Sequence, residues 1–369
     1  MDHPERGVSG WRKWGRRALV TLALLLVVLS FLPLWETDRW WVRQWDYPRL
    51  QVAGLLLIIG VALFLVKLDR RHGWPLLGAV AVALAWQASH FIAYLPPYPR
   101  QVASAQNCLP GRQVSLLNAN VLLTNHEYAK LLRLVEGQKP DVLLLLEPGA
   151  EWEKAVRPLA ERYPYRLSEA VPNTYGMILM SRLPMRGGIA HLLQPAVPSA
   201  HVWVRLAGGQ EVILHALHPE PPWPGDDSGE RDAELVKVGR MVRNDGRASI
   251  VLGDLNDVAW SRTSQLFHKV AGMRDPRVGR GFYPTFNANY PLLRWPLDHL
   301  FVSPHFELMS IDVLPDIGSD HFPIFFRLCL KEDARERKVS PSASATTEAE
   351  ASEELGEGVV EKRKEDGGR

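Results

Sequence analysis

The chain has 369 residues, enough for one large domain and an additional module. Its 43 basic and 41 acidic side chains leave a net charge of +2, which excludes a protein that binds nucleic acid through overall charge. Two cysteines, Cys108 and Cys329, exclude a cysteine zinc framework and a disulfide-dense scaffold. They flank the soluble part of the chain, and both alternatives stay open: two free thiols, or one disulfide formed in an oxidising compartment.

Three apolar runs near the N-terminus predict transmembrane helices, at about residues 18–35, 50–67 and 75–95. Each approaches the roughly 20 residues that a helix needs to cross about 30 Å of hydrocarbon. The third run is the weakest because it contains Gln87, Ser89 and His90. The first could be a signal peptide, but bulky residues follow it instead of a cleavage site. We therefore predict a membrane module with three transmembrane helices over residues 1–100.

Basic residues set the expected orientation of this module. They gather before the first run and between the second and third, at Arg6, Arg12, Lys13, Arg16, Arg17, Lys67, Arg70 and Arg71. Short loops rich in lysine and arginine stay in the cytoplasm. Three crossings then place the rest of the chain in a periplasmic or extracellular space, whereas two crossings would leave it in the cytoplasm. We expect a multi-pass protein of the cell membrane with its main domain outside.

Residues 112–330 read as a soluble α/β domain. Strands are predicted at 114–122, 141–146, 177–180, 201–206, 211–217, from 248, 298–302, 307–313 and 322–330, and helices at 128–135, 152–159 and 235–242. Hairpins mixed with crossovers predict two packed sheets with helices outside. From Lys331 the chain has almost no large apolar residue, which predicts a disordered charged tail over residues 331–369.

Polar side chains lie at the ends of several predicted strands. The strand ending at Gly253 is followed by Asp254 and Asn256, whose side chains face the same way because they are two positions apart. Similar positions are Asn118, Asn120, Glu147, His218, Asp298, His299, Ser319, Asp320 and His321. Each alone fits an ordinary turn, cap or strand edge. Together, the oxygen donors suit Mg²⁺ or Mn²⁺, and the histidines suit acid–base chemistry near neutral pH.

The order and the residue identities of the polar motifs resemble those of the endonuclease/exonuclease/phosphatase superfamily, which has the deoxyribonuclease-I-like fold. The segments are Asn120-Val121, Pro140-Asp141-Val142 running to Glu147, Gly253-Asp254-Leu255-Asn256, Leu297-Asp298-His299-Leu300-Phe301 and Gly318-Ser319-Asp320-His321-Phe322-Pro323. The chain resembles in particular a bacterial branch in which membrane helices precede the catalytic domain. The resemblance implies an α/β (α+β) fold, a four-layer αββα sandwich over residues 112–330, and metal-dependent phosphoester cleavage.

The resemblance also implies roles for individual residues. Glu147 would be the main ligand of Mg²⁺ or Mn²⁺, with Asn120 and Asp320 nearby. Asp254 would handle the proton of the attacking water or of the leaving oxygen. Asn256 would hold a phosphate oxygen.

Histidines complete the expected site. Asp298 would orient His321, whose imidazole would face the phosphate. His218 matches the mid-domain histidine of the superfamily, and His215 on the same strand is the competing choice.

Three functional hypotheses follow. The first is a membrane-anchored phosphodiesterase or nuclease, the second a phospholipid or phosphoinositide-type hydrolase, and the third a catalytically inactive membrane scaffold with the same fold. The expected partners are a phosphodiester, either nucleic acid or phospholipid, and the lipid bilayer, with no obligate protein partner. Leu255 replaces a frequent aromatic residue of the superfamily, and no basic stripe of a tight DNA binder is visible. Nuclease activity therefore follows from the resemblance rather than from charge.

Overall fold

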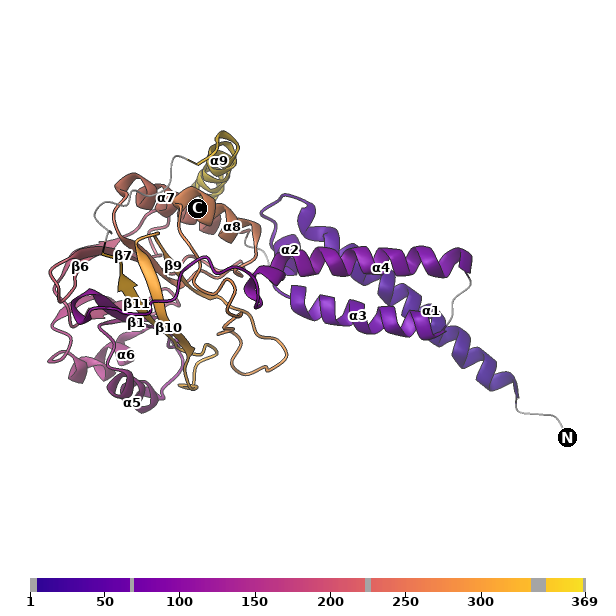
Figure 1. Cartoon of the computed structure of the whole chain (residues 1–369), viewed down its shortest axis with the longest axis horizontal. Helices are drawn as coiled ribbons and strands as arrows, with labels where there is room; N and C mark the ends of the chain where they lie inside the picture. The colour runs from indigo at the N-terminus through magenta and orange to yellow at the C-terminus, as the bar shows by residue number, and fades with distance from the viewer. Residues whose placement is uncertain (1–4, 67–69, 223–226, 333–342, 368–369) are drawn as a thin grey trace. The chain divides into compact units, whose positions relative to one another are not determined.

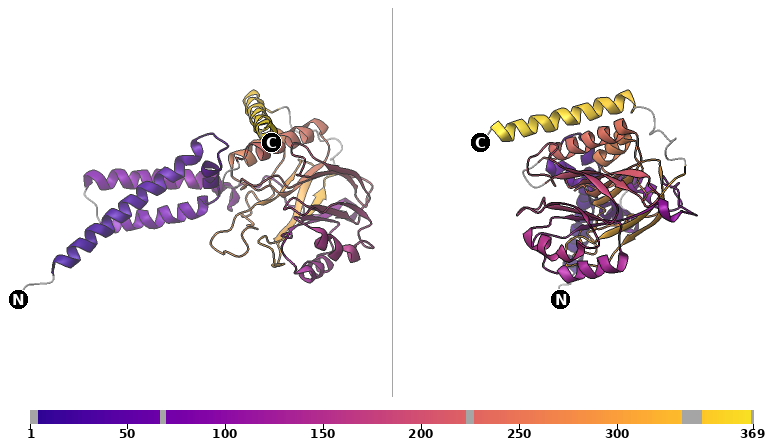
Figure 2. Two further views of the ribbon diagram at one scale, coloured as in Figure 1. Left: turned by 180° about the vertical axis from the view of Figure 1, so that it is seen from behind. Right: turned by 90° about the vertical axis from the view of Figure 1, so that its left-hand side faces the viewer.

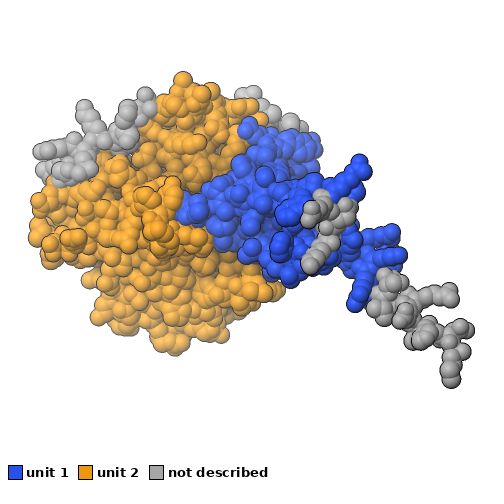
Figure 3. Space-filling model, turned by 45° about the vertical axis from the view of Figure 1, so that its right-hand side comes forward, with its two compact units in different colours: residues 1–93 blue, residues 94–369 orange. Residues whose placement is uncertain are grey.

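The computed structural model describes residues 5–66, 70–222, 227–332 and 343–367. The chain divides into two compact units, Met1–Ala93 and Tyr94–Arg369 (Figures 1 and 3). The first unit contains the helices α1 (Glu5–Phe31), α2 (Trp40–Arg43), α3 (Arg49–Val66) and α4 (Arg70–Phe91). Helices α1, α3 and α4 share one apolar cluster that includes Leu26, Leu56 and Val80.

Three segments of the first unit are long and apolar enough to cross a membrane, namely Trp11–Leu34, Arg49–Val66 and Arg71–Tyr94. They coincide with the three predicted runs, and their insertion in a bilayer stays a prediction. The polar side chains that made the third run a weaker candidate have hydrogen-bond partners in α3 or α4. Gln87 accepts a hydrogen bond of 3.1 Å from Arg49, and His90 Nδ1 lies 2.9 Å from the carbonyl oxygen of Trp86. Such pairing lowers the cost of burying polar side chains in hydrocarbon.

The second unit contains two mixed β-sheets packed face to face (Figures 1 and 2). The six-stranded sheet has the order β10 (Phe306–Val313), β11 (Ile324–Leu330), β1 (Gln113–Asn120), β2 (Val142–Leu146), β4 (Met177–Ser181), β3 (Tyr165–Glu169). The five-stranded sheet has the order β5 (Met185–Ala190), β6 (Ser199–Arg205), β7 (Glu211–Leu217), β8 (Ser249–Asp254), β9 (Asp298–Val302).

Helices cover the outer face of each sheet. Helices α5 (Tyr128–Gln138) and α6 (Ala150–Ala155) pack on the six-stranded sheet, and α7 (Gly229–Asp245) and α8 (Arg262–Ala271) pack on the five-stranded sheet. The result is the predicted four-layer sandwich. Strands β3 and β5 and helix α8 were not predicted. Strand β5 contains two glycines, which disfavour a strand, and it is ordered through pairing with β6.

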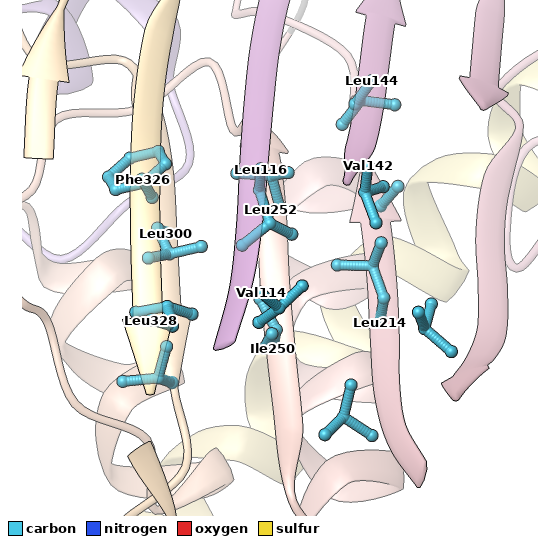
Figure 4. Close-up of a cluster of buried hydrophobic side chains, with 14 of the residues drawn as sticks. Val114, Leu116, Val142, Leu144, Leu214, Ile250, Leu252, Leu300, Phe326 and Leu328 are labelled. Carbon is cyan, nitrogen blue, oxygen red and sulfur yellow. The ribbon is translucent and has the colours of Figure 1, made fainter. Parts of the chain in front are cut away.

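The core lies between the two sheets. Alternate residues of each strand point into it, for example Leu116 on β1, Leu252 on β8 and Leu300 on β9 (Figure 4). Burying one such side chain contributes about 1.5–3 kcal/mol. Because the alternation has a period of two residues, it also decides which polar side chains at the strand ends face inward.

The C-terminal segment differs from its prediction. Residues predicted as part of a disordered tail form helix α9 (Ala345–Gly367), whereas residues 333–342 and 368–369 lie outside the described part of the chain. Ala351 and Leu355, four positions apart, pack against Val236 of α7 and Leu266 of α8. Three ion pairs join α9 to these helices: Arg240–Glu348, Arg262–Glu350 and Arg262–Glu354. Few apolar residues suffice because they share one helix face and the segment is rich in alanine and glutamate.

Cys108 and Cys329 form a disulfide, with a Cα–Cα distance of 5.9 Å. It joins the segment before β1 to strand β11, across 221 residues of chain. Of the two alternatives that the sequence left open, the structure therefore has the disulfide.

Candidate active site

The inner faces of both sheets become polar at one end. On β1 the inward positions continue from Leu116 to Asn118 and Asn120, and on β8 they continue from Leu252 to Asp254. Strand β9 begins with Asp298, which pairs directly with Asp254 across the antiparallel ladder. Because the inner faces of the two sheets oppose each other, these side chains meet at a common end of the sandwich.

Gly253 permits the close approach of β7 and β8 just before Asp254. Its φ is +151°, and a Cβ atom there would lie 1.9 Å from the carbonyl oxygen of Leu217. The following turn is fixed by Asn256, whose backbone N–H donates to Asp254 Oδ1 at 2.9 Å. The side-chain amide of Asn256 donates to the carbonyl oxygen of Pro219 at 2.9 Å. Its φ of +50° is unusual for a residue other than glycine, and such conformations gather at functional sites.

His321 lies between two buried carboxylates. Its Nδ1 is 2.8 Å from Asp298 Oδ2, and its Nε2 is 3.4 Å from Asp254 Oδ2. Asn118 holds the other oxygen of Asp298 by donating to Oδ1 at 2.8 Å. Burial by itself would lower the pKa of His321, but Asp254 and Asp298 raise it, so the imidazole favours its cationic form. Burial raises the pKa of Asp254, and His321 opposes that rise.

Asn120 connects this group to Glu147. Its amide donates to Glu147 Oε1 at 2.8 Å and lies 3.3 Å from Asp254 Oδ2. Glu147 has a φ of +60°, and its backbone N–H donates to the carbonyl oxygen of Gly176 at 2.9 Å. Its Oε2 is buried and has no hydrogen-bond partner among the described residues, and burial raises the pKa of this carboxyl group. A buried oxygen without a partner fits a cation ligand.

Asp320 is half-buried beside this cluster. Ser319 donates to its carboxylate at 3.4 Å, and the carboxylate raises the pKa of both Glu147 and His321. A second set of groups could also hold a metal ion: ligand atoms of Asp254, Asp298 and His321 lie within 4.8 Å of one another. These three residues and the oxygens around Glu147 are two separate candidate ligand sets for a divalent cation.

His218, rather than His215, lies near the cluster. His218 continues the inward positions of β7 and is buried; burial lowers its pKa to about 4, and the charge of His321 contributes to the same shift. His215 lies on the opposite face of β7, where its Nδ1 is 2.8 Å from Nδ1 of His201 on β6. The imidazole of His218 is therefore neutral and faces the site.

The His201–His215 pair predicts a loss of stability in acid. Burial lowers the pKa of His201 to about 4 and that of His215 to about 3, from 6.5 for an exposed imidazole. Below about pH 6.5 the unfolded chain therefore binds more protons at these two histidines than the folded chain does. We expect the free energy of unfolding to fall by about 2 kcal/mol per histidine between pH 7 and pH 5.

Urea denaturation of the full-length chain in mild detergent, at a series of pH values, measures this dependence. The matched variant, with His201→Gln and His215→Gln together, should show a shallower slope over the same range. Equal slopes for the two proteins would show that the pair is protonated when folded.

Several contacts at the site were not predicted from the sequence. Asn118 was visible as a polar strand-end residue, but its bond to Asp298 depends on packing between the two sheets. The ring of Phe286 lies 4.8 Å from the ring of His321. Tyr175 donates to Glu220 Oε1 at 2.7 Å, and its ring lies 6.1 Å from that of His218. No local sequence signal marks the last two contacts, because both involve loops.

Comparison with known proteins covers the second unit. A family model described as Endonuclease/Exonuclease/phosphatase family matches residues 114–321, more than half of the chain. Similar solved structures include an endonuclease/exonuclease/phosphatase from Beutenbergia cavernae, at 20% identity and a TM-score of 0.48, covering 59% of this chain and 72% of that chain. Another is D. rerio TDP2 complexed with single strand DNA product, at 19% identity and a TM-score of 0.49, covering 58% and 98%.

Sphingomyelinase C from Streptomyces griseocarneus is also similar, at 17% identity and a TM-score of 0.43, covering 58% of this chain and 99% of that chain. No curated protein sequence matches the chain.

Proposed function

Because the chain belongs to the endonuclease/exonuclease/phosphatase family, we propose that it is a membrane-anchored, divalent-cation-dependent phosphodiester hydrolase. One observation carries the proposal. Asp298, His321 and Asp254 form a continuous buried chain of contacts, and Asn120 links that chain to Glu147. An inactive scaffold would have no need to bury several carboxylates together, because burying charge without a bound partner is costly.

The residues present fit Mg²⁺ or Mn²⁺. Glu147 would be the main ligand, because Asn120 holds one of its oxygens and the other is buried without a partner among the described residues. Asn120 and Asp320 would supply the other ligands that the protein offers to the cation. All three offer oxygen, which these cations prefer to nitrogen or sulfur. A bound cation would offset the negative charge that grows on the phosphate oxygens and lower the pKa of water.

The chain's own residues supply the rest of the chemistry. Cationic His321, held by Asp298, donates a hydrogen bond to a phosphate oxygen, and neutral His218 offers a second donor. The amide of Asn256 holds another phosphate oxygen. Asp254, beside His321 Nε2, moves the proton of the attacking water or of the leaving oxygen. Donors fixed in advance of the reaction typically contribute about 2.7–4 kcal/mol each to transition-state stabilisation.

A substrate screen tests the proposal. The full-length chain in detergent would be assayed with Mg²⁺ on DNA, RNA, phospholipid vesicles and a small soluble diester. We expect hydrolysis of at least one phosphodiester, its loss with EDTA, and its recovery with added Mg²⁺ or Mn²⁺. Activity that survives EDTA would contradict the cation requirement, and an inactive chain on all four substrates would contradict the proposal.

We further propose that the second unit lies outside the cytoplasm. The distribution of basic residues around the three candidate spans supports this side. The Cys108–Cys329 disulfide supports it independently, because such bonds persist in oxidising compartments and are rare in the cytosol.

Thiol labelling in cells tests this placement. In cells expressing the full chain, trapped with acid before lysis, Cys108 and Cys329 should resist a maleimide reagent until a reductant is added. A Cys108→Ser variant should leave Cys329 free to react, which provides the positive control. Complete labelling of the unaltered chain without reductant would contradict the outward placement.

A further inference from the structure

The segment 286–295 forms a hairpin with an apolar tip. Tyr290, Leu292 and Leu293 have exposed fractions of 60%, 86% and 46%. Among the described residues of the second unit, no other stretch of four positions exposes three large apolar side chains. Single exposed leucines are ordinary, but a cluster on a protruding loop indicates a contact surface.

The hairpin is ordered by its own hydrogen bonds. Backbone N–H groups of Phe286 and Asn287 donate to the carbonyl oxygens of Trp295 and Leu293, at 3.0 and 3.2 Å. At the tip, the N–H of Leu293 donates to the carbonyl oxygen of Tyr290 at 3.0 Å. These bonds fix the backbone of the hairpin, and in that conformation the side chains of Tyr290, Leu292 and Leu293 are exposed.

The base of the same hairpin contacts the candidate active site. The ring of Phe286 lies 4.8 Å from that of His321, and the N–H of Ala288 donates to the carbonyl oxygen of Asp320 at 2.7 Å. Leu292 is six residues from Phe286, so its Cα lies at most about 20 Å away along the chain. Whatever the tip binds is therefore held close to the phosphate-facing groups.

The composition of the hairpin selects a lipid surface. Residues 286–297 contain no acidic side chain, and Arg294 lies next to the tip. Tyrosine and tryptophan are the residues that favour the interfacial layer of a bilayer, and leucines suit its acyl boundary. The leucines lack the flat rings on which nucleic-acid bases stack. Three candidate membrane spans in the same chain keep a bilayer within reach.

We propose that the 286–295 hairpin enters the interfacial layer of a bilayer and that the neighbouring site hydrolyses the phosphodiester of a phospholipid there. This rests on the proposed phosphodiester hydrolase activity. In the reaction, the oxygen of water bonds to phosphorus and one ester P–O bond breaks. The attacking water loses one proton and the leaving alcohol oxygen receives one, so water is the only co-reactant.

A fluorescent label tests the membrane contact without any need for activity. Because both native cysteines are in the disulfide, Leu292→Cys adds a single reactive thiol. The full chain, labelled with an environment-sensitive dye, would be reconstituted in vesicles of phosphatidylcholine and phosphatidylglycerol. We expect a blue-shifted emission and strong quenching by nitroxide-labelled lipid. The matched control is Glu161→Cys, an exposed position remote in sequence from the hairpin. Equal emission and quenching for the two labels would overturn the proposal.

A second experiment tests the substrate class. In the Leu292→Asn, Leu293→Asn variant, the ratio of kcat/KM on phospholipid vesicles to kcat/KM on a soluble diester should fall by about tenfold or more. Leu109→Asn changes another leucine, 59% exposed, and should leave the ratio unchanged. An unchanged ratio in the double variant, or a selective loss of activity on single-stranded DNA, would overturn the proposal.

The two levels of the proposal fail in different ways. If the unaltered chain hydrolyses no diester at all, the proposed activity fails, while the label at position 292 still decides whether the hairpin meets lipid. If the chain hydrolyses soluble diesters or nucleic acid but not vesicles, the activity stands and the phospholipid assignment fails.

Discussion

Replacement of Asp254 by asparagine should lower kcat for phosphodiester hydrolysis by roughly a thousandfold. The amide has almost the same size, so the bond from the Asn256 N–H and the packing of β8 can persist. It cannot take up a proton, and it removes the negative charge beside His321 Nε2. Single-turnover kinetics on whichever diester the screen identifies, with saturating Mg²⁺, would separate this loss from weaker substrate binding.

The same reasoning predicts how Asp254 and His321 combine. Because the two side chains act as one unit, Asp254→Asn together with His321→Gln should lose little more activity than the worse single variant. Asp312→Asn, an exposed aspartate on β10, is the matched control and should keep full activity. Near-normal kcat in Asp254→Asn, or in His321→Gln, would show that the reaction occurs elsewhere on the molecule.

Replacement of Glu147 by glutamine should raise the Mg²⁺ concentration needed for half-maximal activity by roughly a hundredfold. Glutamine can still accept the bond from Asn120, but it offers a cation a neutral oxygen in place of a charged one. Titration with Mn²⁺, monitored by electron paramagnetic resonance, measures the affinity of the site for this cation without relying on turnover.

Glu151→Gln, four positions along in α6 and exposed, should bind Mn²⁺ like the unaltered chain. Unchanged Mn²⁺ affinity in Glu147→Gln would favour the competing ligands Asp254, Asp298 and His321, which also lie close enough to share an ion.

Much of the fold follows from local patterns in the sequence. Strands such as β2 and β8 are runs of buried aliphatic residues that end at a polar side chain, and their period places Asp254 on the inner face. Strand β3 escaped prediction because its side chains are partly exposed and lack such a run. Helix α9 was not predicted because composition alone does not show that Ala351 and Leu355 share one helix face and pack against apolar residues of α7 and α8.

The candidate site likewise has parts that the sequence predicts and parts that only the folded structure shows. The motifs around Asp254 and His321 are each contiguous in the chain, so the amino-acid sequence alone makes them recognisable. The contacts of Asn118 with Asp298 and of Phe286 with His321 join residues 180 and 35 positions apart, and only folding of the chain brings them together. Roles such as cation ligation stay predictions until the variants are measured.

Helix α9 also bears on how the second unit can be prepared in isolation. Without it, Val236, Leu266 and Val270 would lose the apolar cover provided by Ala351 and Leu355. The helix it covers, α7, carries Arg231, whose guanidinium donates to the carbonyl oxygen of Asn256 at 2.9 Å. We therefore expect a fragment that ends at residue 330 to expose an apolar surface on α7 and α8 and to hold the turn at Asn256 less firmly. A fragment that extends to residue 367 should keep the cover on that surface and the support of the turn.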